Sequence, residues 1–250
     1  MSGLICAGDV QIAILNDDGS FKGFMPVKNT VQLQIANGDN NEKTRVSKQI
    51  ASFGQALDTV YTPGASVLTI GLDEHDADIA GMSFRGEVTQ ITRAAQNGVK
   101  ATVALPASGL WLPVADGAYN LTAVSVKALD DQGEEGAALE LNKDYKLDAE
   151  SGMIMKIEGG AAGGEVEVTY SAPAQSGVRV TPGTKPTLRI RVYGKMKNLA
   201  TGKFIYINIP EAAVYPSTEV DFLADSFSVA TFGGPIKSVN GAAPFTADYL

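Results

Sequence analysis

Short runs in which every second residue is apolar, separated by turn-forming residues, dominate this chain. The segments 188–193 and 205–209 are clear examples. Successive side chains of a β-strand point to opposite faces, so each run would place its apolar residues on one face. We find about a dozen such runs, no long helical pattern and no repeat of a solenoid period. The sequence therefore predicts an all-β fold, a β-sandwich or barrel, with one short helix and a long loop or arm.

Turn signals between the runs predict individual hairpins. The run 10–15, the turn 16–20 and the run 21–27 are typical of one hairpin, and 145–147 with 153–157 are typical of another. Other strands are predicted at 31–35, 65–72, 83–93, 165–170, 188–193, 204–209, 214–220 and 226–232, two more between 99 and 128, and an acidic turn at 130–136.

The segment 37–64 does not fit the strand pattern. It begins with polar, turn-forming residues, and Val46, Ile50, Phe53 and Leu57 then follow at helical spacing. A glycine interrupts that spacing, and the apolar residues are too sparse to bury the segment against its own subunit. The sequence therefore predicts either a mobile loop or an arm that becomes ordered on a partner.

An acidic segment precedes the one predicted helix. Asp73, Glu74, Asp76 and Asp78 come before a short apolar run at 79–82, and acids favour the positive amino end of a helix. These carboxylates lack the spacing of a calcium-binding EF-hand loop, and the turn at Asn16–Ser20 lacks it as well. We interpret the cluster as a solvated helix start.

The residue types needed for catalysis are sparse. His75 is the single histidine and Cys6 the single cysteine, so any Ser-His or Cys-His nucleophile system would have to use them. We expect an exposed His75 with no nucleophile beside it. The Gly-rich segment 159–164 and Gly202-Lys203 do not match phosphate-binding loops. We therefore expect no enzyme and no catalytic, cofactor-binding or metal-binding residues, although a carboxylate pair for glycoside cleavage stays open as an alternative.

The net charge of −8 over 250 residues argues against a protein that grips phosphate groups. The charge is uneven: 97–175 carry 12 acids and 5 bases, a net charge of −7, whereas 176–250 carry 5 and 8, a net charge of +3. A lone cysteine indicates a reducing compartment, and neither a signal peptide nor a bilayer-spanning segment is apparent. We expect a protein made in a cytoplasm, with no membrane contact.

Several segments, taken in chain order, resemble the corresponding segments of one known protein family. They are 8–10 before the first hairpin, 45–47 with 54–60, 68–80 with Gly86, 142–145 with 151–152, 189–194, 201–203, 205–209 and 214–225. Together they resemble the major tail tube proteins of long-tailed, siphovirus-like bacteriophages. The match spans most of the chain but contains no chemical signature. Residues 193–196 depart from it, because many members have a Gly-Thr-Asn-like turn there.

This resemblance implies a structural protein of the virion tail, assembled in the cytoplasm of the bacterial host. Hexameric rings would stack into a hollow tube, with inner strands joined across subunits and the long loop reaching an adjacent ring. The tube would enclose the tape measure protein, contact the tail terminator and distal tail proteins, and conduct double-stranded DNA without binding it specifically. An anionic bore would keep DNA from adhering.

The resemblance also implies a domain organisation for the chain. We expect a single tail-tube domain, 1–250, in which 97–175 is an inserted β section between the core halves 1–96 and 176–250. The segment 172–186, rich in Pro, Gly and Ser, would return the chain to the main sheet. We further hypothesise that 37–64 is disordered in the monomer and becomes ordered between rings, which would slow spontaneous nucleation.

Two other functions remain open. One is a β-sandwich binding module for carbohydrate or protein, for which Trp111 is the one tryptophan available. The other is the tube protein of a contractile injection machine or type VI secretion system. The inserted section makes the chain longer than such compact tubes need.

Overall fold

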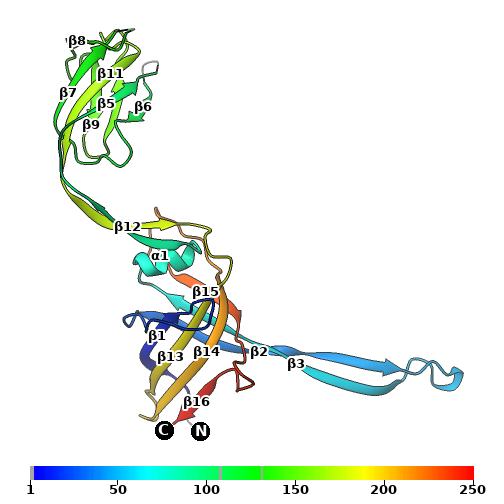
Figure 1. Ribbon diagram of the computed structural model, residues 1–250. Coiled ribbons are helices and arrows are strands. Elements are labelled where there is room, and N and C mark those ends of the chain that lie inside the picture. Colours follow the sequence, from blue (N-terminus) through cyan, green and yellow to red (C-terminus); the bar gives the residue numbers. More distant parts are fainter. Residues whose placement is uncertain (1–2, 107–108, 131) are drawn as a thin grey trace. The chain divides into compact units, whose positions relative to one another are not determined.

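The computed structural model describes residues 3–106, 109–130 and 132–250, and the fold is all-β. The described residues form 16 strands, one α-helix and one 3-10 turn (Figure 1). They divide into two compact units: Met1–Thr89 with Arg179–Leu250, and Gln90–Val178. Among the described residues, no helix has the length and hydropathy needed to cross a bilayer.

The first unit is built on antiparallel strands in the order β1-β13-β14-β15-β3-β2, with β16 also paired to β14. Its elements are β1 (Cys6–Ile14), β2 (Thr30–Val46), η1 (Ile50–Ser52), β3 (Ala56–Leu72), α1 (Ala77–Ser83), β13 (Leu188–Asn198), β14 (Phe204–Pro216), β15 (Ala230–Pro235) and β16 (Thr246–Tyr249).

Alternating residues of these strands form the core of the first unit. On β13, Leu188, Ile190 and Val192 are buried, as the alternation predicts, and they join Ile70 of β3 and Phe232 of β15. Each apolar side chain withdrawn from water contributes about 1.5–3 kcal/mol to folding. The alternating apolar residues of the strands therefore form one shared face, and this face is the hydrophobic core of the first unit.

Helix α1 begins as the acidic segment predicts. The Asp76 carboxylate accepts a hydrogen bond from the Ile79 N–H at 2.9 Å, which satisfies one of the free amides of the first turn. Ile79 and Met82 are buried against the core of the first unit. The short helix thus covers part of that core.

The second unit is a β-sandwich with a core of its own. One sheet has the strand order β5-β11-β7-β8 and the other the order β6-β10-β9. Val126, Ile154, Val166 and Val168 are fully buried between them. Its strands are β5 (Gln96–Ala104), β6 (Trp111–Pro113), β7 (Thr122–Leu129), β8 (Glu135–Ala138), β9 (Tyr145–Asp148), β10 (Met153–Lys156) and β11 (Glu165–Ala172).

Two further strands, β4 (Glu87–Arg93) and β12 (Gln175–Thr181), pair with each other, and the boundary between the units crosses both. The connection predicted at 172–186 therefore contains a strand. The expected insertion, 97–175, falls inside the second unit. Residues 99–128 hold three strands rather than two, and Asp131 of the predicted acidic turn lies outside the described residues.

One predicted strand is wrong, and two others are confirmed only in part. Residues 21–27 do not form the second strand of a hairpin, because only the Val10–Lys28 bridge and a 2.8 Å hydrogen bond from Met25 N–H to Ile12 link them to β1. Pro26 has no N–H to donate to a ladder. Residues 217–229 form a loop between β14 and β15, so the predicted strands 214–220 and 226–232 are confirmed only at 214–216 and 230–232.

The segment 37–64 is neither a loop nor disordered. It continues β2 and β3 as an antiparallel hairpin in which Lys43 faces Val60 and Thr44 faces Thr59. Gly38 and Gly64 face each other where the register shifts, and a Cβ on Gly38 would lie 2.3 Å from the Ala65 carbonyl oxygen. The helical spacing reflects only the 3-10 turn η1 at the end of the hairpin. We call residues 37–64 the arm.

Candidate assembly surfaces

His75 has a nucleophile beside it, contrary to our expectation. It is exposed, as predicted, but its Nε2 lies 3.0 Å from the Oγ of Ser228. Nucleophilic catalysis also needs a group that orients the histidine. Among the described residues, Ser228 is the only hydrogen-bond partner of the His75 ring, so the pair has the geometry of a surface contact.

The acids around His75 are engaged in local structure. Asn29 donates its side-chain amide to Asp73 at 2.8 Å and its backbone N–H to Glu74 at 2.9 Å. Lys28 forms an ion pair with Asp76. Burial raises the pKa of Asp76, but hydrogen bonds from Lys28 and the Ile79 N–H outweigh it, so the pKa lies below its ordinary value. Over the part of the chain that the structure describes, no group of acids, His and Cys is arranged to hold a metal ion.

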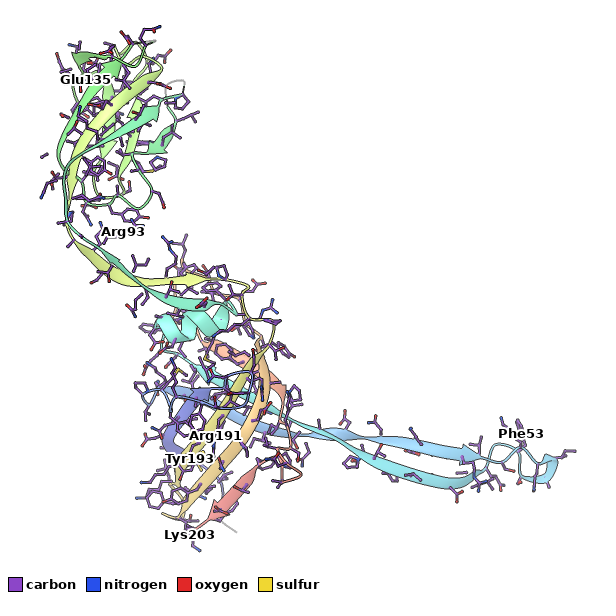
Figure 2. All side chains as sticks on the ribbon, viewed as in Figure 1. Phe53, Arg93, Glu135, Arg191, Tyr193 and Lys203 are labelled. Atoms are coloured by element: carbon purple, nitrogen blue, oxygen red, sulfur yellow. The ribbon has the colours of Figure 1, made fainter. Side chains whose placement is uncertain are left out.

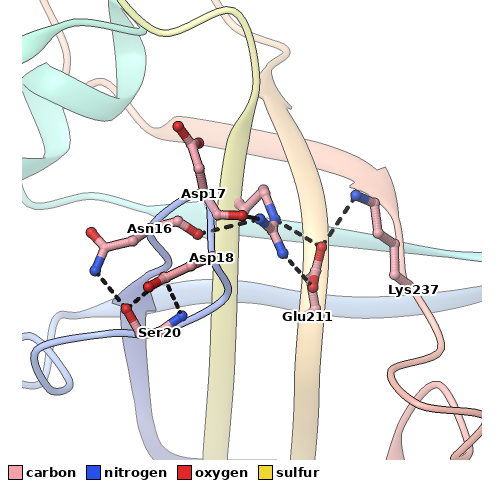
Figure 3. A network of polar contacts seen from close by, with 7 residues as sticks. Asn16, Asp17, Asp18, Ser20, Glu211 and Lys237 are labelled. Carbon is pink, nitrogen blue, oxygen red and sulfur yellow. Dashed lines mark hydrogen bonds and ion pairs between the residues drawn. The ribbon is translucent and has the colours of Figure 1, made fainter.

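An ion-pair network centred on the buried Glu211 joins β13 and β14 of the first unit (Figure 3). The Glu211 carboxylate accepts two hydrogen bonds from Arg189, both at 2.9 Å, and pairs with Lys237 at 3.1 Å. Arg189 also donates to the backbone oxygens of Asp17 and Asn16 at 2.7 and 3.2 Å. The network therefore fastens the turn at 16–20 to β13 and β14.

The charges of this network hold one another ionised. Hydrogen bonds from Arg189 and Lys237 lower the pKa of Glu211 against the opposing effect of burial. Glu211 in turn raises the pKa of Arg189. A hollow of about 600 Å³ beside them is lined by Asn16, Asp17, Arg189 and Lys237 with backbone and side chains of 184–188. Since Glu211 already satisfies both cations, we interpret the network as structural.

The turn at the end of the arm is organised by Ser47. Its N–H donates to the Gln55 carbonyl at 2.8 Å, and its own carbonyl accepts from the Gly54 N–H at 3.0 Å. Its hydroxyl contacts the Ser52 hydroxyl at 2.7 Å and accepts from the Gln49 N–H at 3.2 Å. Ser47 is buried, whereas its neighbours are exposed. We call residues 47–55 the arm tip.

The arm tip displays apolar side chains to solvent. Ile50 is fully exposed and Phe53, labelled at the end of the hairpin in Figure 2, is 70% exposed. Lys48 places its Nζ 5.4 Å from the centre of the Phe53 ring. The arm adds Leu57, Val60 and Tyr61 as exposed large side chains. Contiguous exposed apolar groups of this kind mark interaction sites.

A second apolar surface lies on residues 217–229, which we call the apolar loop. Phe222, Leu223 and Phe227 are 81%, 91% and 97% exposed. Phe222 stacks on Phe84, with ring centres 6.1 Å apart. Our sequence reasoning missed this surface because it placed Phe227 in a strand and left Phe222 and Leu223 in the connection between two predicted strands. The available signal was the adjacent Phe222 and Leu223, which break the alternation of a half-buried strand.

Two strand edges of the first unit are also open: that of β16, and that of β1 at residues 6–9, before the Lys28 bridge to Val10 and the Met25 hydrogen bond to Ile12. In the order β1-β13-β14-β16, the strands β1 and β16 are the outermost. Residues 6–9 of β1 are exposed, and in the described residues β16 has no strand on the side away from β14. Open edges present free N–H and C=O groups, which another chain can pair with.

Trp111, the tryptophan considered for a binding module, lies on the outer face of the three-stranded sheet in the second unit. Met155 of β10 stands opposite it, and Lys146 of β9 stands opposite Met155. Trp111 is 41% exposed. The structure therefore places an exposed aromatic side chain beside a half-buried thioether on this face.

The family described as "Protein of unknown function UCP028589" matches residues 4–240. The chain belongs to this family. The match includes the arm, the apolar loop, strand β1 and the whole second unit, whereas strand β16 lies beyond it. No curated protein matches the chain.

Proposed function

We propose that this protein is the structural subunit of a phage tail tube. Its copies would form hexameric rings that stack into a hollow tail tube in the virion, assembled in the bacterial cytoplasm. The tube would enclose the tape measure protein, contact the tail terminator and distal tail proteins, and conduct double-stranded DNA. The order of segments in the sequence and the surfaces of the first unit support this proposal.

The observation that carries the proposal is the arm. A hairpin of paired strands holds Ile50 and Phe53 in water, although each would gain free energy from burial. The internal hydrogen bonds of the arm tip fix its conformation before any contact forms. A partner would therefore bind an arm tip that is already ordered, so little conformational entropy of the arm would be lost on binding.

The open edges suit a ring. Strand β1 lies at one side of the β1-β13-β14-β16 sheet and β16 at the other. If β1 of one copy pairs with β16 of the next, the contact is heterologous, and a heterologous contact closes into a ring when the rotation permits. A closed ring of this kind removes both edges, which otherwise favour uncontrolled aggregation.

A uniformly anionic bore no longer forms part of the proposal. The face of this sheet away from the core carries Asp9 and Asp248 but also Lys195 and Lys197. In the ladder Asp9 stands opposite Lys195. If this face lines the channel, DNA meets mixed charge instead of the wholly anionic wall that would keep it from adhering.

Negative-stain electron microscopy of the purified protein tests the proposal. We expect rings or regular hollow filaments as the protein concentration rises, with light scattering that increases in parallel. Monodisperse monomers at the highest reachable concentration, across a range of salt and pH, would contradict a self-assembling tube. A matched control lacking residues 40–62 of the arm should form no filaments under the same conditions, because the deletion leaves only the β1 and β16 edges for ring formation.

The second unit supports a second candidate function, a binding module for carbohydrate. The exposed Trp111 offers a flat apolar surface on which a sugar ring could stack. Quenching or shift of its fluorescence on titration with bacterial cell-wall saccharides would support this function, because it is the one tryptophan in the chain. A Trp111→Phe variant provides the blank for the titration.

A further inference from the structure

We propose that the arm tip of one copy docks on the apolar loop of a second copy. This inference names the surface that receives the arm, and it rests on the proposed self-assembly of the protein. It follows from three features of the structure: two uncovered apolar surfaces, opposite charges on them, and their presence on the same chain.

The two surfaces have matching apolar character. The arm tip exposes Ile50 and Phe53, and the apolar loop exposes Leu223 and Phe227 almost completely. Within the described residues, the hydrogen bonds of the arm tip stay inside the hairpin. A hydrogen bond links the two ends of the apolar loop: the Thr218 hydroxyl accepts from the Thr231 N–H at 3.0 Å. Each surface is thus held in place while its apolar groups remain in water.

The charges of the two surfaces are complementary. Residues 47–55 contain one base, Lys48, and no acid. Residues 217–229 contain three acids, Glu219, Asp221 and Asp225, and no base. None of these four side chains forms an ion pair among the described residues. Opposite charges attract the two surfaces to each other, and contacts between two surfaces of the same charge are disfavoured.

Tip-to-tip and loop-to-loop contacts would bring like charges together, whereas a tip-to-loop contact pairs unlike ones. Because the tip and the loop are different surfaces of one chain, each bound copy still has a free tip or a free loop. Such a head-to-tail contact continues from copy to copy. The contact would therefore propagate an assembly instead of ending it at a dimer.

Disulfide trapping tests which surfaces meet. In a Cys6→Ser background, Ile50→Cys and Leu223→Cys proteins are mixed under mild oxidation and the mixed dimer is followed on non-reducing gels. We expect the mixed dimer to form at least about tenfold faster than with a Leu199→Cys protein, which places a thiol on an exposed turn of the same unit. A mixed dimer no faster than this control would overturn the proposal.

Charge reversal tests the recognition itself. Lys48→Glu on the Ile50→Cys protein, or Asp225→Lys on the Leu223→Cys protein, should each slow trapping by about tenfold. Combining the two should restore part of the lost rate, whereas unchanged rates in both single variants would contradict electrostatic pairing. If the mixed dimer is trapped but no rings or tubes form, the tip-to-loop contact is supported and the proposed tail tube function is refuted. If tubes form but the mixed dimer is not trapped, the proposed tail tube function is supported and the tip-to-loop contact is refuted.

Discussion

At the scale of single residues, a few buried polar groups hold the irregular segments of the first unit in place. Glu211 is 7% exposed and lies between Arg189 and Lys237. Through Arg189 it secures the turn at 16–20, which has only turn hydrogen bonds of its own. A buried carboxylate is tolerated there because two cations and their hydrogen bonds compensate for its lost hydration.

Replacing Glu211 with Gln should lower the free energy of unfolding by about 1–3 kcal/mol at neutral pH, because Arg189 would lose a charged partner. The pKa of Glu211 is lowered in the folded state, so its contribution is present above its ordinary pKa of 4.5. That contribution is lost as the pH falls through the lower, folded-state pKa. Urea unfolding between pH 7 and pH 3 should show the two proteins converging in stability towards acid.

Glu219→Gln serves as the control for this experiment, because Glu219 lies in the apolar loop without an ion pair among the described residues. It should leave the unfolding free energy within about 0.5 kcal/mol of the parent protein. A Glu211→Gln protein that matches this control at pH 7 would show that the network contributes nothing to stability.

At the scale of elements, the arm shows how a hairpin persists without a core. Its strands carry Thr44 opposite Thr59, with hydroxyls 3.1 Å apart, and Arg45 opposite Asp58, paired at 2.6 Å. Such cross-strand pairs are individually weak, and isolated two-stranded hairpins are marginal in water. The turn organised by Ser47 is therefore an important part of what keeps the strands together.

Replacing Ser47 with Ala should loosen the arm tip and leave the rest of the protein unchanged. The substitution removes the hydroxyl that contacts Ser52 and accepts from Gln49. We expect amide hydrogen exchange at Gly54 and Gln55 to accelerate by at least about tenfold, while the β13 amides keep their protection. Uniform acceleration across the first unit would show that the arm and the sheet open together.

Deleting residues 40–62 should prevent the stacking of rings into filaments without unfolding the protein. The cut leaves Gly38 and Gly64 as a pair at the base of a shortened hairpin, and the strand residues it removes are exposed. We expect an unchanged circular dichroism spectrum and a thermal midpoint within about 4 °C of the parent. Size-exclusion chromatography with light scattering should report nothing larger than a single ring, and normal polymers of the shortened protein would contradict a role for the arm.

At the scale of the whole molecule, the chain contains two separate cores. Ile190 belongs to the buried cluster of the first unit and Ile154 to that of the second. A unit with its own core can unfold as a cooperative unit. The −7 charge of residues 97–175 also falls entirely on the second unit, so the two units differ in charge as well as in core.

Replacing either isoleucine with Ala should therefore destabilise one unit only, by about 2–5 kcal/mol. We expect calorimetry to show two transitions, with Ile154→Ala lowering one midpoint and Ile190→Ala lowering the other. Tryptophan fluorescence should follow only the transition that Ile154→Ala shifts, because Trp111 belongs to the second unit. A single transition displaced equally by both substitutions would show that the units unfold together.

The sequence by itself determined the all-β class, the buried faces of β11 and β13, the hairpin of β9 with β10 and the capped helix α1. Each depends on a local pattern, either alternation or a cap, which acts within a few residues. Only the tertiary structure decided that 37–64 extends a hairpin, because its strands pair polar residues across the ladder and carry no alternation to detect. It also decided that Ser228 meets His75 and that Glu211 joins Arg189 and Lys237, since these partners are distant in the chain and meet only when the strands assemble.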